Sequence, residues 1–160
     1  MIEHDSDKLF LGQAIEMAAN GMRNNEGGPF GAVIVKDGII VGRGNNKVTS
    51  TNDPTAHAEV VAIRDACKNL NTFQLTGCTL YTSCEPCPMC LAAIYWARPD
   101  RVVYGCSKED AAAIEFDDAF IYNEIQLAIS DRKMLMQQLN RDEAKKVFDE
   151  WAAKVDKTSY

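Results

Sequence analysis

The chain of 160 residues lacks several features that mark common classes of protein. No apolar run approaches the roughly 20 residues that a membrane-spanning helix requires. The N-terminus has neither the basic nor the apolar region of a secretory signal. Basic residues are in deficit, because 17 Lys and Arg stand against 23 Asp and Glu, and the formal net charge is −6. This charge opposes tight binding to a phosphate backbone. We therefore expect a cytoplasmic protein with a small neutral ligand and no nucleic-acid or membrane partner.

The chain also lacks internal repeats, low-complexity segments and any linker rich in glycine, proline or serine. Its length fits one compact domain with a sizeable core. Hydrophobic residues make up 46% and charged residues 25%, which is an ordinary globular composition. We therefore expect a single domain over residues 1–160.

Histidine is scarce, and this scarcity makes the metal-ligand signal specific. Only two histidines occur, His4 in a polar N-terminal stretch and His57. Cys87 and Cys90 lie three residues apart in a Pro-Cys-Pro-Met-Cys motif. Zinc prefers nitrogen and thiolate ligands in a tetrahedron, and a catalytic zinc keeps three protein ligands and leaves the fourth position to water. His57, Cys87 and Cys90 are therefore predicted to bind one zinc ion.

Glu59 follows the predicted zinc histidine by two residues. A carboxylate at this position can take a proton from zinc-activated water and deliver it to a leaving group without binding the metal itself. His-Ala-Glu followed by Pro-Cys-x-x-Cys is the signature of zinc-dependent nucleobase deaminases. We therefore predict that Glu59 is catalytic and that the reaction is a hydrolytic deamination.

The cysteines leave other interpretations open. Cys84 extends the motif to a C-x2-C-x2-C run, but Ile94 stands where a ferredoxin-type run would have its fourth cysteine. Cys84 could instead complete a four-ligand structural site in a non-enzymatic zinc module, which would leave Glu59 without a role. Disulfides fit a reducing compartment poorly. The remaining cysteines, which lie in apolar surroundings, are expected in the core: Cys67, Cys78 and Cys106.

Hydrophobic periodicity predicts an α/β chain. The elements expected before the cysteine motif are, in order, a helix at 7–24, strands at 30–36 and 39–44, and a polar loop at 45–53. Asp37-Gly38 is a strong signal for a hairpin turn between the two strands. Asp53-Pro54 supplies a capping residue and a proline suited to the first turn of a second helix. This helix would carry His57 and Glu59 in its first turns.

The second half contains a strand–helix–strand unit. Its elements are expected at 79–82, 88–96 and 101–104, and such a unit makes the two strands parallel. Both motif cysteines lie at the start of the helix, where residues three apart share a face and the helix dipole favours thiolates. Two further helices are expected, at 110–114 and along an apolar stripe from 144 to 155. That stripe must pack on its own domain or on a partner subunit, and a stripe is more often core than interface.

These motifs together resemble the cytidine-deaminase superfamily, and within it most closely the small bacterial guanine deaminases. The resemblance runs nearly end to end and is carried by residues 27–35, 52–59, 81–90, 94–99 and 116–118. It implies a three-layer α/β/α sandwich around a mixed five-stranded sheet. It also implies conversion of guanine to xanthine and ammonia. The alternatives are deamination of adenosine in tRNA and deamination of cytosine or guanosine.

The same resemblance assigns residues that bind substrate. Asn46 resembles an asparagine that hydrogen-bonds the base edge, although an asparagine here also fits a turn. Phe30 resembles an aromatic residue that stacks on the purine, although aromatic residues are common in strands. Asp118, with Asp117 as the alternative, resembles an acid that contacts the guanine amino group. A carboxylate suits this role because it accepts hydrogen bonds from N–H donors.

Two further positions complete the predicted substrate site. Ala58 lies between His57 and Glu59 in the metal motif. Tyr160 ends a C-terminal segment, at about 140–160, that crosses to a partner subunit in the enzymes that this chain resembles. The resemblance therefore implies a homodimer in which Tyr160 closes the partner's site.

Overall fold

The computed structural model describes residues 2–160, with side chains described from residue 5 onward. The chain forms two compact units, Met1–Asp118 and Ala119–Tyr160. Within the described residues, no helix is both long and apolar enough to cross a membrane.

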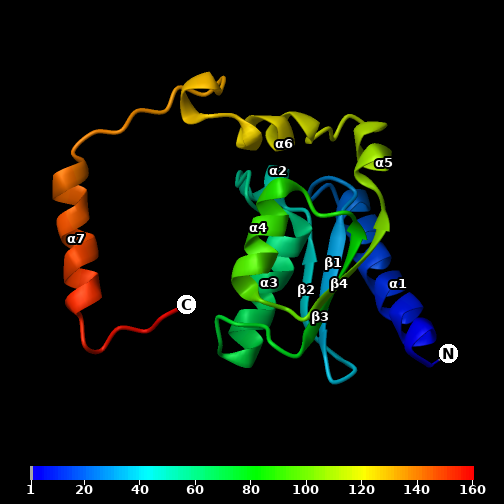
Figure 1. Ribbon diagram of the computed structural model, residues 1–160. Coiled ribbons are helices and arrows are strands. Elements are labelled where there is room, and N and C mark those ends of the chain that lie inside the picture. The colour runs from blue at the N-terminus through cyan, green and yellow to red at the C-terminus, as the bar shows by residue number, and fades with distance from the viewer. Residues whose placement is uncertain (1) are drawn as a thin grey trace. The chain divides into compact units, whose positions relative to one another are not determined.

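A mixed sheet of four strands forms the centre of the first unit (Figure 1). Its strands lie in the order β2 (Ile39–Asn45), β1 (Gly31–Lys36), β3 (Cys78–Cys84) and β4 (Arg101–Cys106). β1 is antiparallel to both of its neighbours, and β3 and β4 are parallel. The predicted α/β class, hairpin and parallel pair are therefore confirmed. The turn between β1 and β2 has positive φ angles at Asp37 and Gly38, as a two-residue hairpin requires.

The prediction of a fifth strand is wrong, because the described chain after β4 contains helices and irregular segments only. A capping box at Ser107 explains why a helix follows β4 directly. The Ser107 side chain accepts a hydrogen bond from the backbone of Asp110, and the Asp110 carboxylate accepts one from the backbone N–H of Ser107 at 2.8 Å. These bonds start helix α5 (Lys108–Ala112) directly after the strand. The helix expected at 110–114 is present, but it begins two residues earlier.

Helices cover both faces of the sheet, which gives three layers (Figure 1). α1 (Ile2–Arg23) places Ala14 against Val33 and Tyr81 on one face. α3 (Ala58–Leu70) and α4 (Pro88–Ala97) pack against Ile34 and Leu80 on the other face. Alternate residues of β1 and β3 thus serve opposite layers, as the two-residue period of a strand dictates.

Close backbone packing positions the start of α3 on the sheet. A Cβ atom at Gly44 of β2 would lie 2.2 Å from the carbonyl oxygen of Ala58 and 2.5 Å from the backbone nitrogen of Ala62. Both alanines are fully buried. Only a glycine in β2 and small residues in α3 permit this approach. The approach determines where the residue before α3, His57, is held.

The first half of the chain also differs from the prediction at the starts of α1 and α3 and in the loop between β2 and α3. α1 begins at Ile2 rather than near residue 7, and the predicted loop contains a short helix, α2 (Val48–Thr51). α3 begins at Ala58, because Asp53 does not cap it. The Asp53 carboxylate instead accepts hydrogen bonds from the backbone N–H of Thr55 at 2.8 Å and from its hydroxyl at 2.6 Å. This local turn replaces the predicted first helical turn.

The prediction that Cys106 lies in the core is also wrong. Cys78 is buried and Cys67 is half-buried, but Cys106 is exposed. Cys106 ends β4, which is an edge strand with only one neighbouring strand. Apolar neighbours in the sequence therefore do not make Cys106 a buried residue.

The second unit contains α6 (Ala119–Gln126), the short 3-10 helix Ile129–Asp131 and α7 (Arg141–Ala153). The predicted helix over the C-terminal stripe is confirmed. None of the residues of α7 is buried within the chain, and its apolar residues Val147, Phe148 and Trp151 are 62%, 75% and 46% exposed. Ion pairs such as Lys145 with Asp149 lie on the helix surface and add little stability.

Candidate metal centre and active site

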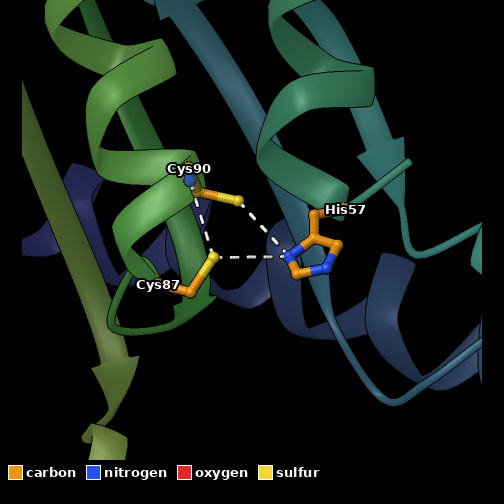
Figure 2. Close-up of side chains that lie close together, drawn as sticks. All are labelled: His57, Cys87 and Cys90. Carbon is orange, nitrogen blue, oxygen red and sulfur yellow. Dashed lines mark hydrogen bonds between the residues drawn. The ribbon is translucent and has the colours of Figure 1, made fainter. Parts of the chain in front are cut away.

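Two helix starts bring the predicted metal ligands together. His57 is the N-cap residue of α3, and Cys87 is the N-cap residue of α4. Both have extended backbone angles, as N-cap residues do. Pro88 follows at the first helical position, so Cys90 lies in the first turn of α4. Figure 2 shows the imidazole and the two thiols pointing toward one another from these two helices.

The distances fit one zinc ion. The Nδ1 atom of His57 lies 3.5 Å from the Sγ atoms of both Cys87 and Cys90 (Figure 2). All three ligand atoms lie within 4.8 Å of one another. Tetrahedral zinc with normal Zn–S and Zn–N bonds holds nitrogen and sulfur about 3.5 Å apart. His57 and Cys87 are half-buried and Cys90 is buried, so two of the three ligands are partly exposed. The donor set and the spacing therefore both suit zinc.

The electrostatics of the site favour a thiolate at Cys87. The pKa of Cys87 falls to about 4, chiefly because the Cys90 thiol donates to its sulfur and also because His57 lies beside it. The backbone N–H of Cys90 adds a further hydrogen bond at 3.5 Å. The pKa of Cys90 rises, because Cys90 is the donor to Cys87 and is buried. The pKa of His57 rises through its contact with Cys87. The surroundings of Cys87 therefore favour the thiolate, which is the form that binds zinc.

Glu59 lies beside the cluster in the first turn of α3. Its side chain is buried, with 6% of its surface exposed, and its Oε2 atom lies 3.3 Å from the Sγ atom of Cys90. Glu59 is not a member of the cluster of potential metal ligands, which consists of His57, Cys87 and Cys90. Burial raises the pKa of its carboxyl group. A buried carboxyl group with a raised pKa next to a metal site suits a group that both takes up and releases a proton.

Cys84 does not join the metal cluster. Its Sγ atom donates instead to the carbonyl oxygen of Ser107 at 3.5 Å, and burial raises its pKa to about 11. Across the described part of the chain, the metal-ligating group near Cys87 consists of the three predicted residues alone. Cys84 therefore does not complete a closed site with four ligands.

Asn46 takes part in a turn and still offers a donor. Its Oδ1 atom accepts a hydrogen bond from the backbone N–H of Val48 at 3.1 Å, so the orientation of the amide is determined. The Nδ2 group has no acceptor among the residues that the structure describes. The backbone N–H of Asn46 donates to the carbonyl oxygen of Phe30, and that of Lys47 donates to Ala56, next to His57. The two predicted substrate residues are thus neighbours, and their turn is tied to the metal histidine.

Phe30 packs against an aromatic residue to which the motifs assign no separate role. Its ring and that of Phe116 meet edge to face, with centroids 4.9 Å apart and planes at 87°. A Cβ atom at Gly28 would lie only 3.0 Å from the Phe116 ring. An aromatic residue two positions before Asp118 was the only signal for this contact. This contact restricts the orientation of the Phe30 ring.

The remaining predicted residues have different surroundings. Asp118 is half-buried and Asp117 is exposed. Burial and the negative charge of Cys87 raise the pKa of Asp118, which is consistent with a position near the metal cluster. Ala58 is fully buried in the core. Tyr160 belongs to the second unit and is 71% exposed.

Comparison with known proteins is consistent with this site. Residues 4–106 match the family described as the cytidine and deoxycytidylate deaminase zinc-binding region. Guanine deaminase from Bacillus subtilis is 53% identical over 153 residues, which cover 96% of this chain and 98% of that protein. An X-ray structure of the same enzyme is similar with a TM-score of 0.93 and 52% identity over 96% of this chain and 98% of its own.

Two other relatives match less of the chain. A guanine deaminase structure from Nitrosomonas europaea has a TM-score of 0.65 and 31% identity, and the match covers 68% of this chain and 63% of that chain. A tRNA-specific adenosine deaminase from Aquifex aeolicus is 43% identical over 97 residues, which cover 61% of this chain and 64% of that protein. The similarity to the protein from Bacillus subtilis extends over both units.

Proposed function

The chain belongs to the cytidine and deoxycytidylate deaminase zinc-binding family, and on this basis we propose that it converts guanine and water to xanthine and ammonia. The resemblance inferred from the motifs is thereby confirmed at the level of the family. The observation that carries the proposal is the contact of buried Glu59 with the His57, Cys87 and Cys90 cluster. Similarity to a guanine deaminase over 96% of the chain supports the choice of substrate.

His57, Cys87 and Cys90 would hold the zinc ion. When bound, zinc lowers the pKa of a coordinated water toward ~7 and so supplies the nucleophile at neutral pH. The two helix N-termini at His57 and Cys87 add partial positive charge that stabilises the thiolates. The partial exposure of His57 and Cys87 is consistent with access of water and substrate to the cluster.

Glu59 would move the protons of the reaction. Its carboxylate takes a proton from the attacking water and passes it to a ring nitrogen of guanine. The same carboxylate then takes the remaining proton of the added hydroxyl group and delivers it to the amino group. The C2–N bond breaks, the amino group leaves as ammonia, and the oxygen of the water stays on C2 as the carbonyl oxygen of xanthine. Burial of Glu59 excludes bulk solvent from this transfer. A buried carboxyl group at 3.3 Å from Cys90 is close enough to serve both steps.

Three side chains would recognise the base. The Nδ2 group of Asn46 can donate to an acceptor on the purine edge, because its Oδ1 atom is already bound to Val48. Phe30 can stack on the purine face from its contact with Phe116. Asp118 can accept from the N1 and amino hydrogens of guanine, since an ionised carboxylate is only an acceptor.

The second unit would complete the enzyme as part of a homodimer. The apolar residues of α7 are exposed in the single chain, and an exposed apolar helix face is stabilised when a partner covers it. We place the α7 face of one subunit against a second copy of the chain, with Tyr160 next to the site of that copy. A reducing cytoplasm suits the thiol ligands of the metal.

Deamination of adenosine in tRNA is the second candidate. The relative from Aquifex aeolicus supports it over 61% of the chain. The net charge of −6 opposes it, because RNA binding relies on basic surface. Ammonia release from zinc-loaded protein would be measured with guanine, guanosine, cytosine, adenine and tRNA. We expect release from guanine, and release from tRNA alone would overturn the proposed substrate.

A further inference from the structure

Glu26 lies between the end of α1 and the start of β1 and holds the turn that contains Asn46. Its backbone N–H donates to the carbonyl oxygen of Gly21 at 3.0 Å, which anchors it to the last turn of α1. Its own carbonyl oxygen accepts from the backbone N–H of Ser50 at 3.2 Å and from the hydroxyl of Thr49 at 3.3 Å. Glu26 therefore connects a helix that is packed on the sheet to α2, the short helix that follows Asn46.

The Glu26 carboxylate reaches Asn46 through one intermediate residue. Its Oε2 atom accepts a hydrogen bond from the Nδ2 group of Asn45 at 2.7 Å. The same Nδ2 group donates its second hydrogen to the backbone carbonyl of Asn46 at 3.2 Å. Both hydrogens of the Asn45 amide are thus used, and its side chain is buried. The carboxylate, the Asn45 amide and the Asn46 backbone form one continuous chain of hydrogen bonds.

The residue after Glu26 lies directly against Asn46. A Cβ atom at Gly27 would lie 2.3 Å from the Oδ1 atom of Asn46 and 2.4 Å from its carbonyl oxygen. Any movement of Glu26 along the chain would therefore press Gly27 onto the asparagine or open a gap beside it. Asn46 is held on one side by the Asn45 amide and on the other by the Gly27 backbone.

The bond from Asn45 is stronger than an ordinary amide contact. It lowers the pKa of Glu26 below its usual value, and Lys47 contributes to the same shift. Glu26 is therefore ionised at neutral pH, and its bond to Asn45 is charge-assisted. The ion pair with Lys47 has its atoms 3.6 Å apart at a partly exposed position, so it adds little by itself.

We propose that Glu26 is a positioning residue for substrate binding, which acts through Asn45 to direct the free Nδ2 group of Asn46 toward the purine edge. This inference rests on the proposed function. None of the hydrogen bonds described for Glu26 reaches a metal ligand or Glu59, so its loss should weaken binding of the base and leave the chemistry intact. A purely structural role would instead lower stability and zinc content together with activity.

The test uses the zinc-loaded full chain with Glu26→Ala, Glu26→Gln and the control Glu16→Ala. Glu16 is an exposed acid on α1 whose hydrogen bond, from Gln13, lies within the same helix. We expect Glu26→Ala to raise the KM for guanine roughly tenfold and to raise the Kd for the guanine analogue 8-azaguanine by roughly the same factor. The value of kcat should change less than about twofold. Glu26→Gln retains an acceptor for Asn45 and should stay within roughly threefold of wild type. Glu16→Ala should match wild type, and all variants should keep equal zinc content.

A double-mutant cycle with Asn46→Ala separates positioning from a general effect. If Glu26 acts through Asn46, then Glu26→Ala will add no further increase in KM to the Asn46→Ala chain. Increases that multiply, an unchanged Kd in Glu26→Ala, or a loss of zinc parallel to the loss of affinity would each overturn the role of Glu26. If wild type binds neither guanine nor 8-azaguanine, the proposed function fails and this inference fails with it. Binding by wild type and Glu26→Ala with equal affinity would overturn the positioning role alone.

Discussion

The two units of the molecule differ in how they use their apolar residues. The first unit, Met1–Asp118, buries apolar side chains on both faces of its sheet and contains all three metal ligands. The second unit, Ala119–Tyr160, is described in full and has no buried residue, and its helix α7 exposes Val147, Phe148 and Trp151. A segment of this kind cannot obtain stability from its own core.

This difference matches the extent of similarity to known deaminases. The family match covers residues 4–106, which contain the metal ligands and Glu59. The similarity to the guanine deaminase from Bacillus subtilis extends over 153 residues and so includes the second unit. The chemistry of hydrolysis thus depends on the first unit.

The largest effect is expected from removing one metal ligand of the first unit. Cys90→Ala should lose zinc and lower deamination to background, because two ligands cannot hold a catalytic zinc. Cys84→Ala is the matched control, since Cys84 is buried nearby and bonds to Ser107 instead of joining the cluster. Zinc content and ammonia release would be measured for both. Equal loss of zinc from Cys84→Ala would show that Cys84 is a fourth ligand and that the site is closed.

The next largest effect tests whether the metal cluster alone suffices for chemistry. Glu59→Gln should keep zinc and lower kcat by roughly 10²–10⁴-fold, because the amide cannot carry the proton. Glu16→Gln provides the same change at an exposed position on α1. Turnover and zinc content would be compared between the two variants. Near-normal turnover in zinc-loaded Glu59→Gln would remove Glu59 from the mechanism.

A smaller effect is expected from the second unit. Phe148→Asp should convert a dimer into a monomer, because it places a charge on the apolar face of α7. Guanine KM should rise at least about tenfold if Tyr160 of the partner chain completes the site, while zinc content stays constant. Glu150→Ala on the opposite side of α7 should change neither property. Sedimentation of wild type, Phe148→Asp and Glu150→Ala would measure the oligomeric state of each protein. A wild type that is already monomeric would contradict the proposed homodimer.

The sequence predicted best what depends on local spacing and ligand chemistry. His57, Cys87 and Cys90 were identified by residue type, and the structure brings their ligand atoms together. The start of α3 was placed too early, because Asp53 has the chemistry of a cap but bonds to Thr55 in a turn. The correct prediction of the metal ligands and the wrong start of α3 both concern polar residues near the start of a helix. Asp53 differs in that its carboxylate forms a competing hydrogen bond, and the sequence does not show this bond.

Long-range contacts could not be predicted from the pattern of residues. Glu26 and Asn45 lie 19 positions apart, and no periodicity links an acid after α1 to an asparagine at the end of β2. The fifth strand was carried over from the resemblance, whereas the capping box at Ser107 starts a helix there. The exposure of Cys106 depends on the position of β4 at the sheet edge, which follows from strand order alone.

The smallest effects are expected from two glycines in the first unit, and they show how its packing supports the site. Gly44→Ala would place a methyl group 2.2 Å from the Ala58 carbonyl, so α3 must shift and the free energy of unfolding should fall by about 1–3 kcal/mol. Gly12 lies in α1, where an added methyl group would meet no described atom within 4 Å, and Gly12→Ala should raise the free energy of unfolding by up to about 1 kcal/mol. Denaturant titrations of the zinc-loaded proteins would measure both changes.

Because α3 begins directly after His57, Gly44→Ala should also weaken zinc binding, whereas Gly12→Ala should not. Equal zinc affinity in the two variants would mean that the metal site tolerates movement of α3, and that the close contact of α3 with β2 serves stability alone.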